Sequence, residues 1–181
     1  GGEESIGGSL TAEVTPQTVQ AVVGTLVRPD SYSRSLRVES FWSGGSQSWN
    51  VQVWQKSGLT RIRMETEDGS QPVKLMQSGS GFVTVWQEGL IEDAVTYPGS
   101  DPELIDALQM LPTYENLLAL DPAQIEAAGY VKLDGAWRIM ATVREQPTGY
   151  RMGYYISIET GLLEAAERWD GDTLIYRMSA I

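Results

Sequence analysis

Histidine and cysteine are both absent from this sequence of 181 residues. Without cysteine there are no disulfides and no thiol chemistry. Without histidine there is no Ser-His-Asp or Cys-His catalysis, no His-based zinc site and no histidine general base. Phosphate-binding loops of the GxGxxG and GxxxxGK[ST] types and a GxSxG nucleophile elbow are missing as well. These absences predict a non-catalytic protein with no cofactor and no metal.

Basic residues are also few, with 13 lysines and arginines against 24 acidic residues and a formal net charge of −11. Nucleic-acid binding depends on Lys and Arg that neutralise phosphates, so we expect no nucleic-acid partner. The carboxylates gather at predicted turns, for example in WDGDT (169–173). That position favours solvated turn residues over a calcium loop or a glycosidase pair.

Long apolar runs are lacking too, because no stretch approaches the roughly 20 apolar residues of a membrane span. The chain opens with GGEESIGGSLTAE, whose first eight residues include five Gly or Ser. Such a segment is typical of a flexible tether. We therefore expect residues 1–14 to be a leader and residues 15–181 to be one domain. The expected protein is a lipoprotein with its signal peptide removed, anchored extracytoplasmically at the cell surface or in the periplasm.

Alternation of period two, interrupted by glycine turns, predicts an antiparallel meander. The turns include Gly44-Gly45, Ser57-Gly58 and Asp68-Gly69, and Asp170-Gly171 predicts a final hairpin. The predicted strands comprise residues 36–41, 49–54, 61–65, 73–76, 82–87, 137–143, 150–158, 163–169 and 173–180.

Helical patterns occur at the start and in the middle of the chain. Thr15 as N-cap and Pro16 predict an opening helix with Val19, Val22, Val23 and Leu26 on one face. Three further helical stretches are predicted within residues 101–129. Asp121-Pro122 begins the third of these stretches and Gly129 ends it. A strand block, a helix block and a second strand block predict a mainly β (α+β) fold. We expect a curved antiparallel sheet that forms an open half-barrel, with helices on its concave side as a lid.

Six Trp, eight Tyr and six Met give the sequence many large adaptable side chains. Each one taken alone is explained by core packing. Several of them on one curled sheet would suit an acyl chain or another elongated apolar ligand. The predicted cavity residues are Val51, Val53, Ile62, Met64, Trp86, Met152, Tyr154 and Ile156. The predicted lid residues are Leu108, Met110 and Leu111.

Arg61 and Arg63 flank Ile62 on a predicted strand and lie on the face opposite to Ile62 and Met64. One interpretation is a solvated face with ion pairs to Glu39 and Glu65. The alternative has one of the two arginines at the cavity rim, in contact with an ester or headgroup.

Three segments and the opening helix resemble the LolA/LolB-like lipoprotein-carrier family, which includes the amino-terminal domain of RseB/MucB regulators. The segments are VQVWQKSGLTRIRMET (51–66), GSGFVTVWQEG (79–89) and YYISIETGLLEAAERWDGDTLIYRMS (154–179). The resemblance implies an incomplete antiparallel barrel with a helical lid over a cavity for lipoprotein acyl chains. It also implies an arginine near the lid, for which Arg61 and Arg63 are the matching positions.

The expected function is lipid or apolar-ligand binding, as in lipoprotein transport, with a lipid or an acyl chain as partner. The alternative is an RseB-like regulatory module that recognises a membrane-anchored protein without transporting lipid.

Overall fold

The computed structural model describes residues 12–99 and 111–181, and they form two compact units. Unit 1 comprises residues 12–28 and 112–176, and unit 2 comprises residues 29–99, 111 and 177–181. The sheet has eleven strands in the order β6-β5-β4-β3-β2-β1-β11-β10-β9-β8-β7, so that β6 and β7 are its ends. This mostly antiparallel sheet confirms the predicted mainly β fold class.

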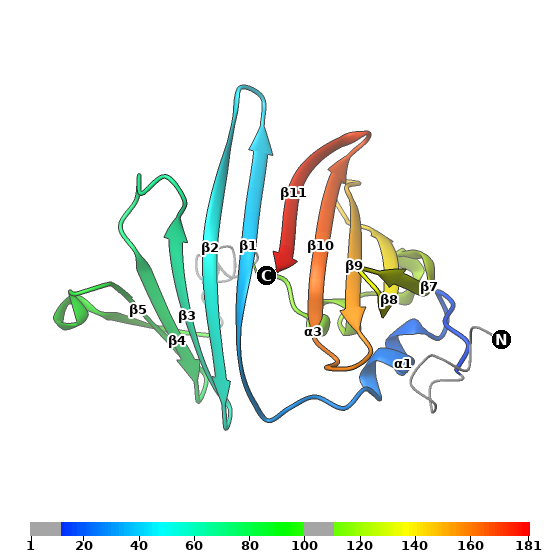
Figure 1. Cartoon of the computed structure of the whole chain (residues 1–181), viewed down its shortest axis with the longest axis horizontal. Helices are drawn as coiled ribbons and strands as arrows, with labels where there is room; N and C mark the ends of the chain where they lie inside the picture. The colour runs from blue at the N-terminus through cyan, green and yellow to red at the C-terminus, as the bar shows by residue number, and fades with distance from the viewer. Residues whose placement is uncertain (1–11, 100–110) are drawn as a thin grey trace. The chain divides into compact units, whose positions relative to one another are not determined.

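Unit 2 contains a meander of six strands and one short helix (Figure 1). Each strand pairs antiparallel with the next one along the chain. Ser57 and Gly58, both at positive φ, close the two-residue turn between β2 and β3. The elements are β1 (Ser31–Trp42), β2 (Gly45–Lys56), β3 (Leu59–Thr66), β4 (Lys74–Gly79), β5 (Phe82–Gln87), the 3-10 helix η2 (Ile91–Asp93) and β6 (Val95–Pro98).

Unit 1 combines two short α-helices with the strands at the other end of the sheet. Helix α1 packs against α3 and β8, and α3 packs against β9 (Figure 1). The elements are α1 (Val19–Gly24), α3 (Tyr114–Leu118), the 3-10 helix η3 (Pro122–Gln124), β7 (Ile125–Leu133), β8 (Ala136–Arg144), β9 (Arg151–Ser157) and β10 (Leu163–Asp170). Strand β11 (Thr173–Ala180) begins in unit 1 and ends in unit 2.

The apolar face predicted for the opening helix is confirmed. Val19 and Val23 are fully buried, and Val22 and Leu26 are nearly so. The helix begins later than predicted, at Val19 with Thr18 as N-cap, because Pro16–Thr18 form a turn before it. Val14, the last residue of the expected leader, is buried as well.

The helix predicted between Asp121 and Gly129 is wrong. Asp121 does cap a helical turn by accepting a hydrogen bond from the Ala123 amide, but the turn ends at Gln124. Residues 125–133 then form β7, which pairs with β8 along its length. The alanines of IEAAG suggest a helix, but strand pairing overrides that weak preference. Strand β6 was not predicted either.

Two side chains attach α1 to its surroundings in unit 1. The Gln20 amide donates to the carbonyls of Leu117 (3.1 Å) and Leu120 (2.8 Å) at the end of α3. The Arg28 guanidinium donates to the carbonyls of Val23 (2.9 Å), Leu26 (3.1 Å) and Gly161 (2.8 Å). It also stacks on the Tyr114 ring, 3.4 Å from the centroid. Both side chains donate to carbonyls at the ends of helices and turns, where backbone hydrogen bonding is incomplete.

Candidate functional site

One face of unit 2, here called the valine face, carries a row of apolar side chains across five strands. Strand register sets these residues directly opposite one another from β2 to β6, and directly opposed residues share a face. The row consists of Val53, Ile62, Met76, Val85 and Val95. Such a row is continuous enough to serve either as a core or as a surface for an apolar ligand.

Exposure along this row is lowest at Met76 on β4 and rises from there toward the edge strand β6. Ile62 and Met76 are 9% and 3% exposed, Val85 is half-buried and Val95 is 49% exposed. The row is therefore buried in the core of unit 2 at β3 and β4 and ends as accessible apolar surface on β5 and β6. Exposed valines at the end of a buried row offer a ligand an already apolar surface.

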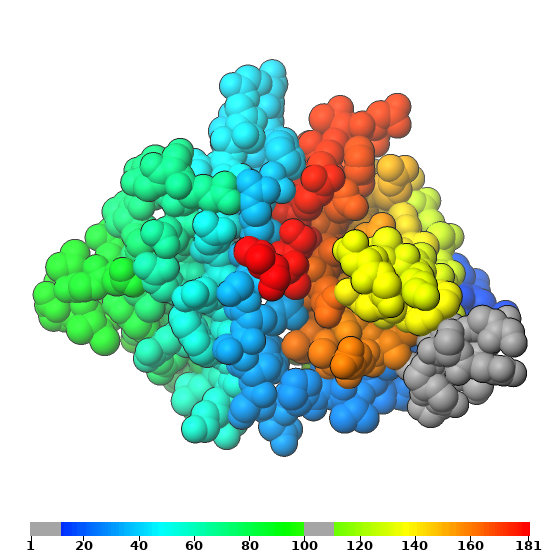
Figure 2. Space-filling model, viewed as in Figure 1, coloured from blue at the N-terminus to red at the C-terminus, as the bar shows by residue number. Residues whose placement is uncertain are grey.

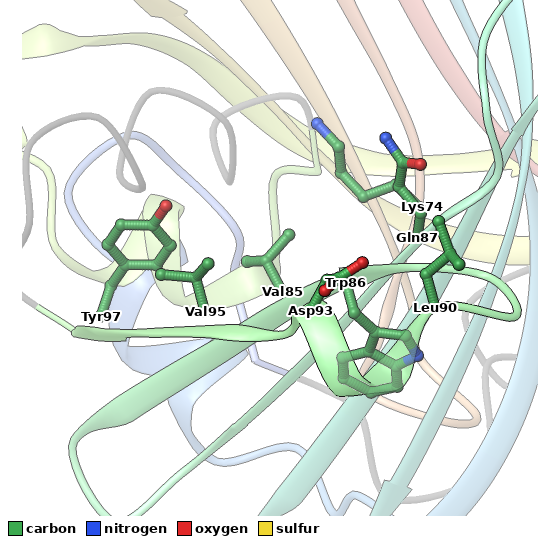
Figure 3. Close-up of a pocket in the computed structure, with 8 residues that line it drawn as sticks. All are labelled: Lys74, Val85, Trp86, Gln87, Leu90, Asp93, Val95 and Tyr97. Atoms are coloured by element: carbon green, nitrogen blue, oxygen red, sulfur yellow. The ribbon is translucent and has the colours of Figure 1, made fainter.

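A cavity of about 340 Å³ opens at this exposed end, and we call it the Tyr97 pocket (Figure 3). Its volume lies at the lower end of the range of roughly 300–1,000 Å³ that is typical of small-molecule sites. Val85 and Val95 lie between Tyr97 on one side and Lys74, Gln87 and Leu90 on the other (Figure 3). The lining residues are Lys74, Val85, Trp86, Gln87, Leu90, Asp93, Val95 and Tyr97.

The polar groups of the Tyr97 pocket differ from one side to the other. Lys74 and Gln87 are directly opposite each other on β4 and β5, and both are exposed. Tyr97 provides an aromatic ring at the other side, on β6. This arrangement can hold an apolar body against the valines while Lys74 and Gln87 contact a polar end of the same molecule.

Grouped His, Cys, Asp or Glu side chains that could hold a metal ion do not occur within residues 12–99 and 111–181. In the same ranges, no helix has the length and apolar character needed to cross a membrane.

The predicted cavity residues fall into both units. In unit 2, Val51, Ile62 and Met64 are buried on the valine face and Val53 is half-buried there. In unit 1, β9 carries Met152, Tyr154 and Ile156, at 0%, 4% and 0% exposure. Six of these side chains are thus buried. Their ligand-binding role stays a prediction.

The packed environment in unit 1 also changes the acidity of the tyrosines. Burial raises the pKa of Tyr154 to about 12, and the nearby Glu145 carboxylate contributes in the same direction. Burial likewise raises the pKa of Tyr176. Arg168 binds Glu145 through Nε (2.5 Å) and Nη2 (3.0 Å) and lies 5.5 Å from the Tyr176 ring centroid. The helices and this cluster account for the burial of β9 without any ligand.

Trp86 lies on the other side of the strand from Val85 and Gln87 (Figure 3). Its indole belongs to the opposite face of unit 2, which also carries Arg61 and Arg63 and is here called the arginine face. Arg63 pairs with Glu88 (2.7 Å) and, as one interpretation predicted, with Glu65 (2.9 Å). The Arg63 hydrogen bond lowers the pKa of the Glu88 carboxyl. The predicted pairing with Glu39 is wrong, because Glu39 binds Arg37 instead.

Two of the three predicted lid residues, Leu108 and Met110, lie outside the described residues. Leu111 is described and is half-buried. The lid therefore stays a prediction.

Of the eight lining residues of the Tyr97 pocket, only Trp86 was among the predicted site residues. The available signal was the short segment Val95-Thr96-Tyr97 with two β-branched residues, bounded by Pro98. Only pairing with β5 identifies this segment as a strand and brings Val95 opposite Val85.

No protein-family model matches the chain, and a search of curated proteins finds no match either. Among solved structures, the chain is similar to MucB in complex with MucA(peri), at 15% identity and a TM-score of 0.48, over 91% of this chain and 52% of that one. It is also similar to a LolA superfamily protein from Nitrosomonas europaea, at 8% identity and a TM-score of 0.41, over 92% of this chain and 91% of that one.

A third similar structure is a DUF1329 family protein from Desulfovibrio piger, at 16% identity and a TM-score of 0.34, over 88% of this chain and 73% of that one. The chain spans about half the length of the MucB chain. At these identities the likeness concerns the fold alone, so the function has to be argued from the surfaces described above.

Proposed function

We propose that this chain is a non-catalytic binding domain for a lipid-like ligand, which lies on the exposed end of the valine face. The observation that carries the proposal is the apolar row whose exposure rises from 3% at Met76 to 49% at Val95, where the row ends in the Tyr97 pocket. The family resemblance extends the proposal to an extracytoplasmic, lipid-anchored protein.

The proposed ligand has an apolar body and a polar end. Val85, Leu90, Val95 and the Tyr97 ring would contact the apolar body, while Lys74 and Gln87 would contact the polar end. Burying about eight methylene groups contributes roughly 6 kcal/mol. Because the ligand also loses translational and rotational freedom, the dissociation constant should be weaker than the roughly 40 µM that this energy alone would give. The pocket is thus large enough for measurable affinity without a fully enclosed cavity.

Titration with cis-parinaric acid, a fluorescent fatty acid, tests the proposal. We expect saturable binding to the full chain and its loss in Val95→Asp, because a carboxylate would then occupy the apolar surface. Val27→Asp is the matched control, since Val27 is an exposed valine of unit 1 at 84%. Equal binding by Val95→Asp and the parent, or no saturable binding by the parent, would rule the proposal out.

A second candidate function is an RseB-like interaction module that recognises a protein. It is favoured by a separate observation, the apolar groove on the arginine face.

A further inference from the structure

A second cavity, of about 370 Å³, lies on the arginine face of unit 2, and we call it the Trp54 groove. Strands β2, β3 and β4 contribute its walls, and the two-residue turn at Ser57-Gly58 joins the first two strands next to it. In the space-filling view of Figure 2, the strands of unit 2 form the cyan to green part of the surface. The lining residues are Trp54, Lys56, Leu59, Thr60, Arg61, Leu75 and Gln77.

Large apolar side chains gather in and beside this groove. Trp54 is 39% exposed, Leu59 is 50% exposed, and Phe82 on the same face is 56% exposed. Leu59 lies close over Gly79, where a β-carbon would come within 2.8 Å of Leu59 Cδ2. Since Phe82 is directly opposite Gly79, the missing side chain leaves Leu59 and Phe82 next to each other. Contiguous exposed apolar surface of this kind marks interaction sites.

Arg61 occupies the centre of this surface and is directly opposite Trp54 on one side and Gln77 on the other. Its guanidinium donates through Nη2 to the Gln77 side-chain oxygen (2.9 Å) and lies 5.8 Å from the Trp86 ring centroid. Trp and Arg are the residue types that dominate binding energy at protein interfaces. A guanidinium held in place by an amide and a ring can donate hydrogen bonds to a carboxylate without first being ordered.

The two charged residues that line the groove, Lys56 and Arg61, are both cationic. Within residues 12–99 and 111–181, no ion pair involves Lys56 or Arg61. Arg63 and Arg37, on the same face, are each bound to two carboxylates. In a chain of net charge −11, the groove is therefore a local exception. At physiological salt, charges more than about 8 Å away are largely screened, so the overall charge of the chain contributes less to attraction at the groove than Lys56 and Arg61 do.

We infer that the Trp54 groove binds a peptide segment of a partner protein that carries a carboxylate next to an aromatic or large aliphatic side chain. The carboxylate would bind Arg61 and Lys56, and the apolar side chain would contact Trp54, Leu59 and Leu75. This inference deepens the second candidate function and does not depend on the Tyr97 pocket, whose valines lie on the opposite face.

Fluorescence polarisation with three labelled eight-residue peptides tests the inference on the full chain. One peptide alternates Phe and Glu, the second replaces each Glu by Lys, and the third replaces each Phe by Ser. We expect saturable binding of the Phe/Glu peptide. The other two should bind at least about tenfold more weakly, because each lacks one of the two required contacts.

Variants assign the binding to the groove. Arg61→Gln and Leu59→Ser should each lower the affinity for the Phe/Glu peptide about fivefold or more. Both residues are exposed, so the variants should fold, which circular dichroism checks. Arg37→Gln is the matched control, because it removes an already paired arginine from the same face, and it should bind within about twofold of the parent. Val95→Asp should also bind normally, since it alters the other face.

Several results would overturn the inference. They are equal binding by Arg61→Gln and the parent, equal binding of the Lys-containing peptide, and absence of saturable peptide binding. Binding to phosphatidylglycerol vesicles but to none of the peptides would also overturn it, in favour of an anionic membrane surface.

Discussion

The two units carry the same kind of alternating strands but use their apolar faces differently. In unit 1, helices α1 and α3 pack against β8 and β9, and Ile139, Met152 and Ile156 are completely buried. In unit 2, the row on the valine face ends at Val95 with 49% exposure beside an open pocket. An apolar face covered by helices becomes a core, whereas the end of the valine face at the sheet edge stays exposed as a surface available for binding.

The largest expected effect is a difference in unfolding free energy between substitutions at a buried position and at an exposed one. Ile156→Ala should lower the free energy of unfolding by about 2–5 kcal/mol, because it leaves a cavity in a packed core. Val95→Ala should change it by less than about 0.5 kcal/mol, as is usual for surface positions. Urea denaturation measures both. Equal losses in the two variants would show that the units do not differ in packing as described.

The next effect concerns the attachment of helix α1. Arg28→Met removes three hydrogen bonds to carbonyls and the contact with Tyr114 while keeping an apolar stem of similar length. We expect a loss of about 2 kcal/mol, because the carbonyls lose a charged donor. Arg37→Met, in an exposed ion pair of unit 2, should have little effect on the same denaturation curve. Full stability of Arg28→Met would mean that Arg28 does not hold the helix in place.

A smaller effect appears at alkaline pH. Burial keeps Tyr154 neutral in the folded state, where its pKa is about 12, against about 10 in the unfolded chain. The stabilisation is fully present below pH 10 and is lost as the pH rises toward 12, because the unfolded state then releases the proton first. We expect Tyr154→Phe to reduce this loss by about 1–3 kcal/mol. Melting temperatures between pH 9 and 12 that fall equally steeply in parent and variant would contradict the assignment.

The strands of unit 2 were predictable as far as β5, because long segments alternate strictly and glycine turns separate them. Strands β6 and β7 were not. Strand β6 has only four residues, too few for a reliable period. In β7, Ala128 pairs with Ala141 and Tyr130 with Ile139, and these long-range contacts decide the structure of an alanine-rich segment.

The alternation of residues along the strand predicted which face of the sheet Ile62 and Met64 share, and their burial confirms it. The location of the pocket was not predictable, because the exposure of Val85 and Val95 depends on their nearness to the edge of the sheet. Alternation correctly places Trp86 and Val85 on opposite faces of β5. Because both faces carry apolar residues, the amino-acid composition did not show which face lines a pocket. The apolar character of Leu59 and Trp54 was equally visible, but only strand register brings them together around Arg61.

The most direct test of the difference between the units is methyl NMR of the full chain during titration with cis-parinaric acid. We predict chemical-shift changes at the methyl groups of Val85, Leu90 and Val95, with the methyl groups of Ile139 and Ile156 unchanged. Shifts at Ile139 and Ile156, with Val85 and Val95 unaffected, would contradict the proposal and would locate the ligand in the core of unit 1 instead.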